Sequence, residues 1–198
     1  MSTLFDYHKL NKTKYMEGFT QEVPLQCESL KKIMNENRIT QAMEIGFNAG
    51  HSADLFLKNN NNLQLVSFDL GQHKSVQTGK TYIDANYPNR HTLILGNSLV
   101  TIPEFIKKND VKFDLIFIDG GHDYNVAIND LYNCKNLAHS NTIVIMDDTV
   151  IKKESVRFYN IGPMKAWSEA KSKNIVHELG SEEYEYGRGQ SWGKYIIN

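Results

Sequence analysis

The sequence predicts an α/β protein with a doubly wound, Rossmann-like sheet in three α/β/α layers. Short runs that are rich in Ile, Leu, Val and Phe, largely on consecutive positions, alternate with segments of helix length. Consecutive apolar residues favour strands that are buried on both faces, as in a parallel sheet. Strand–helix–strand repetition favours right-handed crossovers between such strands. The predicted strands lie at residues 41–45, 63–68, 92–95, 114–118 and 142–146.

Helices are expected between these strands. In the last of them Val126, Leu131 and Cys134 belong to an apolar stripe, which is typical of a helix packed on a sheet. The predicted helices lie at residues 51–58, 76–85, 103–108 and 124–138.

The two ends of the chain break this alternation. Residues 20–37 are predicted to form one leading helix, with Thr20 as its N-cap and Pro24 in its first turn. A helix and an antiparallel hairpin with a long polar loop are expected near the other end. They comprise a helix at 164–173, strands at 175–179 and 192–197, and a loop at 181–190.

Length and composition fit a single domain over residues 1–198, in which residues 1–19 form an N-terminal extension. The chain has 198 residues, 22 Lys and Arg, 23 Asp and Glu, and a net charge of −1. Nucleic acid is not an expected partner, because proteins that bind it usually carry a basic excess. Neither a membrane-length apolar run nor a secretory signal is visible, so no membrane partner is expected. Isolated Cys27 and Cys134 suit a reducing compartment, so we expect a cytoplasmic protein. The sequence leaves the oligomeric state open, with a homodimer as one alternative.

Ligands of open α/β sheets bind beyond the carboxyl ends of the strands. The first strand ends in the sequence EIGFNAGHS, which places Gly46 and Gly50 four residues apart. Glycines allow a tight turn and a close approach of the ligand to the backbone. Ser52 can bind a carboxylate, and Glu44 can accept hydrogen bonds from the loop or hold an ammonium indirectly. A plain turn explains the glycines equally well, and the G-x-x-x-G spacing differs from that of dinucleotide-binding loops.

The next two strands also end in polar residues. Asp69, which precedes Leu70, suits the two hydroxyls of a ribose, although a helix cap is the alternative. Asn97 and Ser98 follow the third strand and suit either an adenine edge or a turn with a helix cap. Together these residues favour a nucleoside ligand.

Acidic residues follow the fourth and fifth strands. Asp119 ends one strand, and Asp147 and Asp148 end the other. Adjacent buried carboxylates repel each other, and three of them suit a hard divalent cation such as Mg²⁺. Alternatively, Asp147 caps a helix and Asp148 faces water. His122 follows two glycines and is expected over the reacting centre. Surface or helix-cap positions are expected for the histidines His8, His91, His139 and His177.

These motifs resemble class I S-adenosylmethionine-dependent methyltransferases, in particular metal-dependent small-molecule O-methyltransferases of the catechol and macrocin types. The resemblance covers roughly residues 20–198. The stretch EIGFNAGHS resembles the family's first motif, E-x-G-x-x-x-G-x-S, and FIDGGHDY with IVIMDDT resembles its metal-bearing pair. The resemblance implies a sheet order of 3-2-1-4-5-7-6 with the last strand antiparallel.

The resemblance also implies roles for individual residues. The cofactor-binding set comprises Glu44, Gly46, Phe47, Asn48, Gly50 and Ser52 near the methionine end, Asp69 and Leu70 at the ribose, Asn97 and Ser98 at the adenine, and Asp119 and Gly120. The implied ligands of Mg²⁺ or Mn²⁺ are Asp119, Asp147 and Asp148. His122 stands where the macrocin type has histidine and the catechol type has lysine. At Asp147-Asp148 the macrocin type has Glu-Asp and the catechol type has Asp-Asn.

The expected reaction is methyl transfer from S-adenosylmethionine to a hydroxyl, with Asp119 and His122 as the catalytic residues. The metal would lower the pKa of the acceptor, and His122 would take its proton. A sugar or glycan-type acceptor is the first expectation and a catechol-like phenol the second. Substrate walls are expected at Tyr15 and Phe19, at residues 150–167, and at the loop 181–190, including the aromatics Phe158, Tyr159, Trp167, Tyr184 and Tyr186.

Three rival functions are weighed against this one. An NAD-dependent oxidoreductase lacks support because G-x-G-x-x-G is absent. A nucleic-acid methyltransferase is disfavoured by the near-neutral charge and the missing [DN]-P-P-[YF] motif. A non-catalytic nucleoside-binding subunit would need neither metal nor His122.

Overall fold

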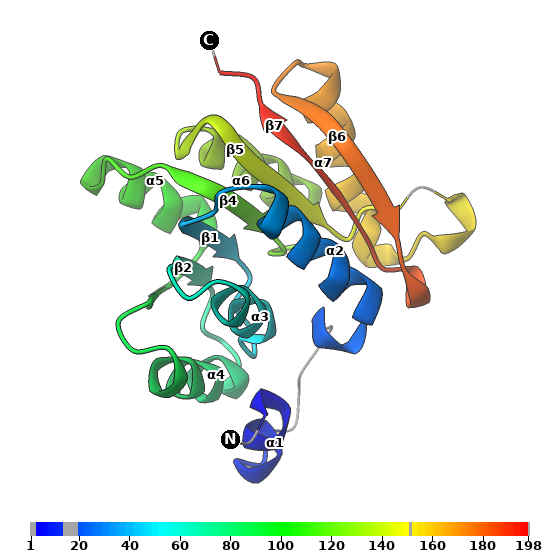
Figure 1. Cartoon of the computed structure of the whole chain (residues 1–198). Coiled ribbons are helices and arrows are strands. Elements are labelled where there is room, and N and C mark those ends of the chain that lie inside the picture. The colour runs from blue at the N-terminus through cyan, green and yellow to red at the C-terminus, as the bar shows by residue number, and fades with distance from the viewer. Residues whose placement is uncertain (1–2, 14–19, 151, 198) are drawn as a thin grey trace.

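The computed structural model describes residues 3–13, 20–150 and 152–197. Its sheet has the strand order β3-β2-β1-β4-β5-β7-β6, which confirms the predicted α/β fold and topology (Figure 1). The first five strands pair in parallel, and β7 runs antiparallel to both β5 and β6. The strands are β1 (Gln41–Ile45), β2 (Gln64–Asp69), β3 (His91–Leu95), β4 (Phe113–Ile118), β5 (Ala138–Asp147), β6 (Val176–Glu183) and β7 (Gly189–Tyr195).

Helices cover both faces of the sheet and make the three predicted layers. One face carries α1 (Leu4–Leu10), α2 (Pro24–Glu36), α3 (His51–Asn59) and α4 (Lys74–Asn86). The other carries α5 (Ser98–Lys108), α6 (Tyr124–Lys135) and α7 (Ile161–Ser172). Short 3₁₀ helices lie at η1 (Thr20–Glu22), η2 (Lys153–Ser155), η3 (Phe158–Asn160) and η4 (Glu185–Gly187).

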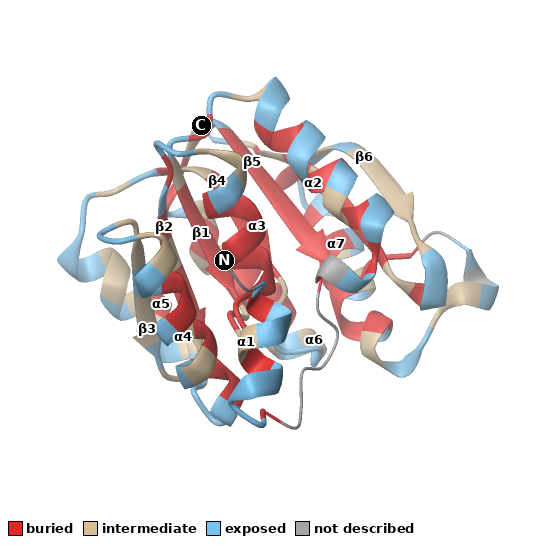
Figure 2. Cartoon of the chain, turned by 60° about the horizontal axis from the view of Figure 1, so that its bottom comes forward, coloured by how far each residue is buried: buried red, intermediate tan, exposed pale blue. Residues whose placement is uncertain are grey.

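The central strands supply both hydrophobic cores. In β4, Leu115 packs with the helices of the first face, whereas its neighbour Ile116 packs with those of the second. Alternate side chains point to opposite faces of a strand, so a strand covered on both sides must be apolar throughout. Figure 2 shows the resulting band of buried residues through the middle of the sheet.

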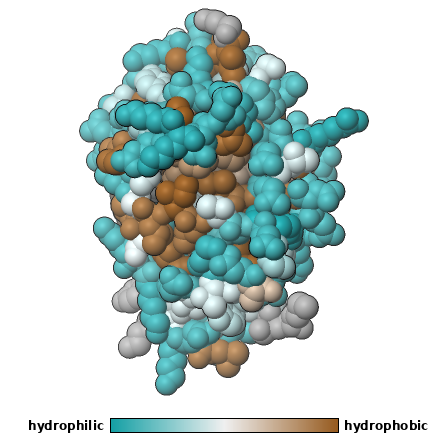
Figure 3. All heavy atoms as spheres, turned by 90° about the vertical axis from the view of Figure 1, so that its left-hand side faces the viewer, coloured by the Kyte–Doolittle hydropathy of each residue, from teal (hydrophilic) through white to brown (hydrophobic). Residues whose placement is uncertain are grey.

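The edge strand β3 is less covered than the central strands. Its residues are half-buried or exposed, and Leu95 is 54% exposed. Figure 3 views this side of the molecule and shows apolar side chains gathered in its middle, framed by hydrophilic ones. Exposed apolar side chains of the elements around β3 include Leu70, Leu95 and Val100.

The prediction of one helix over residues 20–37 is wrong. Residues 20–22 form η1, and α2 begins separately at Pro24, with Val23 as its N-cap. Proline has no backbone N–H and disfavours helical geometry in the preceding residue. Val23 accordingly has φ −119° and ψ 90°, and Pro24 takes the first helical position, where no N–H is needed.

Other boundaries also differ from the prediction. The helix expected at 103–108 begins at Ser98, and the strand expected at 142–146 begins at Ala138. The helix expected to reach residue 138 ends at Lys135, because β5 already begins at Ala138. The loop expected over 181–190 is shorter, because β6 continues to Glu183 and β7 begins at Gly189. Polar Ser181 and Glu182 pair with Ser191 and Gln190 of β7. Antiparallel pairing satisfies their backbone groups whatever their polarity.

Among the described residues, no helix combines the length and the apolar character that a membrane span would need.

Candidate functional site

A cavity of about 680 Å³ lies beyond the carboxyl ends of the parallel strands. Each of these strands contributes to its wall, either with its last residues or with the loop that follows. Representative lining residues, in chain order, are Gly46, Asp69, Asn97, Asp119 and Asp148. The topology therefore brings the predicted strand ends to one site.

The glycine loop, residues 46–50, is shaped by two glycines with positive φ. Gly46 has φ +97°, and a Cβ placed there would lie 1.8 Å from the Asp119 carbonyl oxygen. Gly50 has φ +85° and precedes α3 in the left-handed conformation. Only glycine adopts such angles without cost, and only glycine permits this approach to the end of β4. Phe47, between the two glycines, is buried and stacks on His91 with the ring centres 5.1 Å apart.

Glu44 lies beneath this loop with both oxygens hydrogen-bonded. Ser52 and Ser67 each donate a hydroxyl hydrogen to it across 2.6 Å, and Ser67 also contacts His91 Nε2 at 2.8 Å. Complete burial raises the pKa of Glu44 to about 7, against the lowering effect of the two hydroxyls. Ser52 lines the cavity, whereas Glu44 is covered, so Glu44 supports the site through Ser52.

The ends of β2 and β3 hold their polar side chains in defined positions. Asp69 accepts hydrogen bonds from the backbone N–H groups of Asn48 and Gly71, at 2.8 and 2.7 Å. Asn97 caps α5 by accepting from the Leu99 N–H at 3.0 Å, which confirms the helix-cap interpretation. It also lines the cavity, and its contact with an adenine edge stays a prediction. Leu70 and Ser98 line the same wall.

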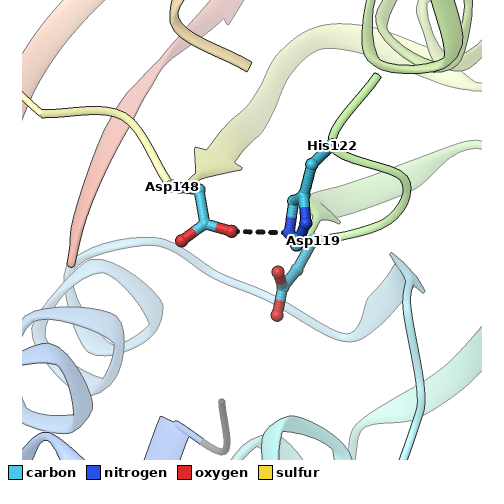
Figure 4. A group of neighbouring side chains, drawn as sticks. All are labelled: Asp119, His122 and Asp148. Carbon is cyan, nitrogen blue, oxygen red and sulfur yellow. Dashed lines mark ion pairs between the residues drawn. The ribbon is translucent and has the colours of Figure 1, made fainter. Parts of the chain in front are cut away.

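At the other end of the cavity, Asp119, His122 and Asp148 point toward one another (Figure 4). Each offers one ligand atom, and these atoms lie within 4.8 Å of one another. His122 Nε2 lies 2.8 Å from Asp148 Oδ2. Asp148 has φ +57°, an uncommon conformation for a residue with a side chain. Gly120, between Asp119 and His122, also lines the cavity.

Asp147 lies beside this cluster and has a different hydrogen-bond partner. It is fully buried, and its Oδ1 accepts a 2.7 Å hydrogen bond from Gln26 of α2. Among the described residues, the cluster with metal-ligand spacing contains His122 in place of Asp147. Whether Asp147 is a ligand therefore stays a prediction.

The carboxyl groups at this end are electrostatically crowded. Burial, followed by repulsion from Asp147 and Asp148, raises the pKa of Asp119 well above its usual value. Burial and then Asp148 raise the pKa of Asp147 to about 7. The hydrogen bond to Asp148 raises the pKa of His122. Arg188 lies 4.0 Å from Asp147 Oδ2 and 3.9 Å from Asp148 Oδ1, a single positive charge beside three acids.

The donor set at this end fits a divalent cation. Carboxylate oxygens are the ligands that Mg²⁺ and Mn²⁺ prefer, and imidazole is compatible with Mn²⁺. A doubly charged ion would also offset the repulsion among the acids, which Arg188 offsets only in part.

Two of the aromatic residues that were predicted to line the substrate site face the cavity. Phe158 and Tyr159 line it and contact each other with ring centres 5.4 Å apart, and the Tyr159 hydroxyl donates to the Tyr186 carbonyl at 3.1 Å. Trp167 instead packs in the core and donates to Glu178. Tyr184 donates to Glu182. Tyr15 and Phe19 lie outside the described residues.

The prediction from the sequence did not identify several residues that contribute to the site. Arg188 lies in the polar stretch that was predicted as a loop, and no role was predicted for it. A lone arginine next to a strand end could have indicated a group that neutralises the acids. His51 lines the cavity as the first residue of α3. The surface or cap prediction is wrong for His8, which is completely buried. It is also wrong for His91, which is half-buried beneath Phe47, whereas exposed His177 agrees with it.

A family model described as a methyltransferase domain matches residues 43–149, more than half of the chain. The matched part contains the glycine loop and Asp119, Asp147 and Asp148. No curated protein matches the chain.

Several methyltransferases of known structure have the same fold. The O-methyltransferase of Bacillus cereus in complex with SAH is 17% identical, with a TM-score of 0.77 over 98% of this chain and 91% of that one. TomG, an O-methyltransferase of Streptomyces achromogenes in complex with SAM, is 13% identical, with a TM-score of 0.74 over 98% and 88%. SAH-bound PaMTH1 of Podospora anserina is 16% identical, with a TM-score of 0.72 over 98% and 88%.

Proposed function

This chain belongs to the methyltransferase family whose model matches residues 43–149, and from that premise we propose that it is an S-adenosylmethionine-dependent O-methyltransferase. Its acceptor is a hydroxyl of a small molecule, and a divalent cation assists the reaction. The observation that carries the proposal is one cavity with two chemically different ends. The glycine loop and Asp69 form one end, and Asp119, His122 and Asp148 form the other.

The cofactor end binds and orients. S-adenosylmethionine supplies an activated methyl group, so the protein does not have to create a leaving group. Asp69 is held by two backbone N–H groups in a position suited to ribose hydroxyls. Ser52 donates a hydrogen bond to Glu44 and lines the cavity where the methionine part of the cofactor is expected. Asn97 and Ser98 form the wall expected at the adenine.

The reaction end activates the acceptor. Asp119 and Asp148, with Asp147 as the third predicted ligand, would hold Mg²⁺ or Mn²⁺, whose Lewis acidity lowers the pKa of a hydroxyl. If His122 donates its Nε2–H to Asp148, its Nδ1 is the ring nitrogen that accepts the proton from the acceptor. The carboxylate of Asp148 then stabilises the imidazolium, which agrees with the raised pKa of His122.

We propose a sugar or glycan-type acceptor first, because His122 stands where the macrocin type has its histidine. A catechol-like phenol is the second candidate. Phe158 and Tyr159 lie on the cavity wall, where either acceptor would bind. These rings can stack on either a sugar face or a planar aromatic ring. A methylation assay with labelled S-adenosylmethionine over both acceptor classes separates the two.

The proposal is tested with the wild-type protein. S-adenosylhomocysteine should raise the melting temperature while NAD does not, and turnover should stop with EDTA and return with Mg²⁺ or Mn²⁺. Stabilisation by NAD alone would identify an oxidoreductase. Turnover that is indifferent to chelation would show a metal-free transferase.

A further inference from the structure

The N-terminal helix α1 contacts the cofactor loop through one buried side chain. His8 is completely buried, and its Nε2 lies 2.8 Å from the carbonyl oxygen of Ala49. Ala49 belongs to the glycine loop and lines the cavity. The helix lies outside residues 43–149, so it is an addition to the part that the family model matches.

The surroundings of His8 determine its charge state and its contacts. Burial lowers the pKa of His8, so the ring is neutral at pH 7 and its Nε2–H can donate to the Ala49 carbonyl. The rings of His8 and His51 lie 5.9 Å apart, and His51 is both a cavity residue and the first residue of α3. His8 therefore braces the loop where it turns into the helix.

Helix α4 also lies against the Ala49 carbonyl. A Cβ on Gly79 would lie 2.4 Å from the Ala49 carbonyl oxygen, so α4 approaches the loop as closely as a glycine allows. Helix α1 is in turn docked on α4 (Figure 1), with the rings of Tyr7 and Tyr82 5.5 Å apart and Thr13 Oγ1 3.4 Å from Thr78 Oγ1. Two helices, α1 and α4, thus approach the Ala49 carbonyl.

We propose that His8 is a positioning residue for the cofactor: its hydrogen bond to Ala49 sets the shape of the glycine loop and couples the docking of α1 to cofactor binding. The inference rests on the proposed function, because it takes the glycine loop as the cofactor site. Coupling between sites is reciprocal, so a cofactor that binds the braced loop also stabilises α1 on α4.

The test compares four proteins: wild type, His8→Ala, His8→Gln and the control Lys9→Ala. Gln keeps a donor near the place of Nε2, and Lys9 is an exposed residue of the same helix. Isothermal titration with S-adenosylhomocysteine should show about tenfold weaker binding for His8→Ala, because a buried carbonyl loses its donor. His8→Gln should stay within about threefold of wild type, and Lys9→Ala should match it.

Two more measurements separate positioning from general destabilisation. In His8→Ala the KM for S-adenosylmethionine should rise while kcat stays within about twofold, since the loop and not the acceptor end is altered. Hydrogen exchange of residues 3–13 should slow on addition of S-adenosylhomocysteine in wild type, but not in His8→Ala.

Wild-type affinity in a folded His8→Ala would overturn the proposal. Equal losses in His8→Ala and His8→Gln would also overturn it, because packing and not the hydrogen bond would then be responsible. If the wild type itself fails to bind S-adenosylhomocysteine, the proposed function is wrong. The positioning role is then judged by hydrogen exchange of residues 46–51 without ligand, where faster exchange in His8→Ala supports it and equal exchange refutes it.

Discussion

The two ends of the cavity differ in how their acidic side chains are stabilised. At the cofactor end the acidic groups are satisfied by neutral donors: Glu44 accepts from two serine hydroxyls, and Asp69 accepts from two backbone N–H groups. At the reaction end Asp119, Asp147 and Asp148 repel one another, and Arg188 supplies one positive charge beside them.

This difference predicts that cofactor binding does not require a cation, whereas the chemistry at the reaction end does. The first end is held in shape by its own hydrogen bonds, so we expect it to bind cofactor with or without metal. The second end stores like-charge repulsion, so we expect a divalent cation to affect both its stability and its chemistry.

The first expected effect is on catalysis and distinguishes the two ends of the cavity. His122→Ala should reduce kcat by roughly 10²-fold or more, because a general base contributes that much, while the Kd for S-adenosylhomocysteine stays nearly unchanged. His177→Ala, an exposed histidine of β6, is the control. Unchanged turnover would remove His122 from the mechanism, and a lost affinity for Mn²⁺ in His122→Ala would make it a metal ligand and not the base.

Gly46→Ala should damage both ends together, because Gly46 joins them. The new Cβ would meet the Asp119 carbonyl oxygen at 1.8 Å, and the backbone φ of +97° disfavours any side chain. We expect a loss of at least about 3 kcal/mol in the free energy of unfolding, measured with urea. A matched Ala substitution at exposed Ser140 should cost less than about 1 kcal/mol. An equally small loss for Gly46→Ala would show that β4 can move away.

Glu44→Gln should change how stability depends on pH at the cofactor end. The pKa of Glu44 is raised from 4.5 to about 7 in the folded protein, so folding favours its neutral form. Its contribution to stability is present below about pH 4.5 and is lost as the pH rises through about 7. Relative to Glu44→Gln, the wild type should therefore lose on the order of 3 kcal/mol between pH 5 and 8.

Urea unfolding of both proteins across that range measures the difference, and the shared titration of the other acids cancels. A difference that does not vary with pH would show that Glu44 is ionised in the folded protein throughout.

The smallest effect concerns the metal. Mg²⁺ at about 100 times its Kd should stabilise the wild type by about 2.7 kcal/mol, seen as a higher melting temperature. Asp148→Asn should abolish this shift, because it removes a ligand and keeps the shape. Asp123→Asn, which keeps the cap of α6 in the loop that follows β4, should retain the shift. An unchanged shift in Asp148→Asn would place the cation elsewhere.

Strong local patterns explain where prediction succeeded. Strand β1 was predicted with its observed bounds, Gln41–Ile45, because apolar Ala42, Met43 and Ile45 come directly before a glycine turn. Prediction failed where tertiary contacts override local character. Polar Ser181 and Glu182 are paired in β6, and polar His8 is buried against a backbone carbonyl.

From residue 20 onward the sequence by itself determined the order of strands and helices and the chemistry at the strand ends, because apolar runs, glycines and acids act over a few residues. Only the tertiary structure decided which side chains meet: His122 beside Asp148, Asp147 turned to Gln26, and Arg188 brought over the acids from the far end of the chain. These partners are set by long-range packing, and the energy of a buried charge depends on neighbours that no local pattern specifies.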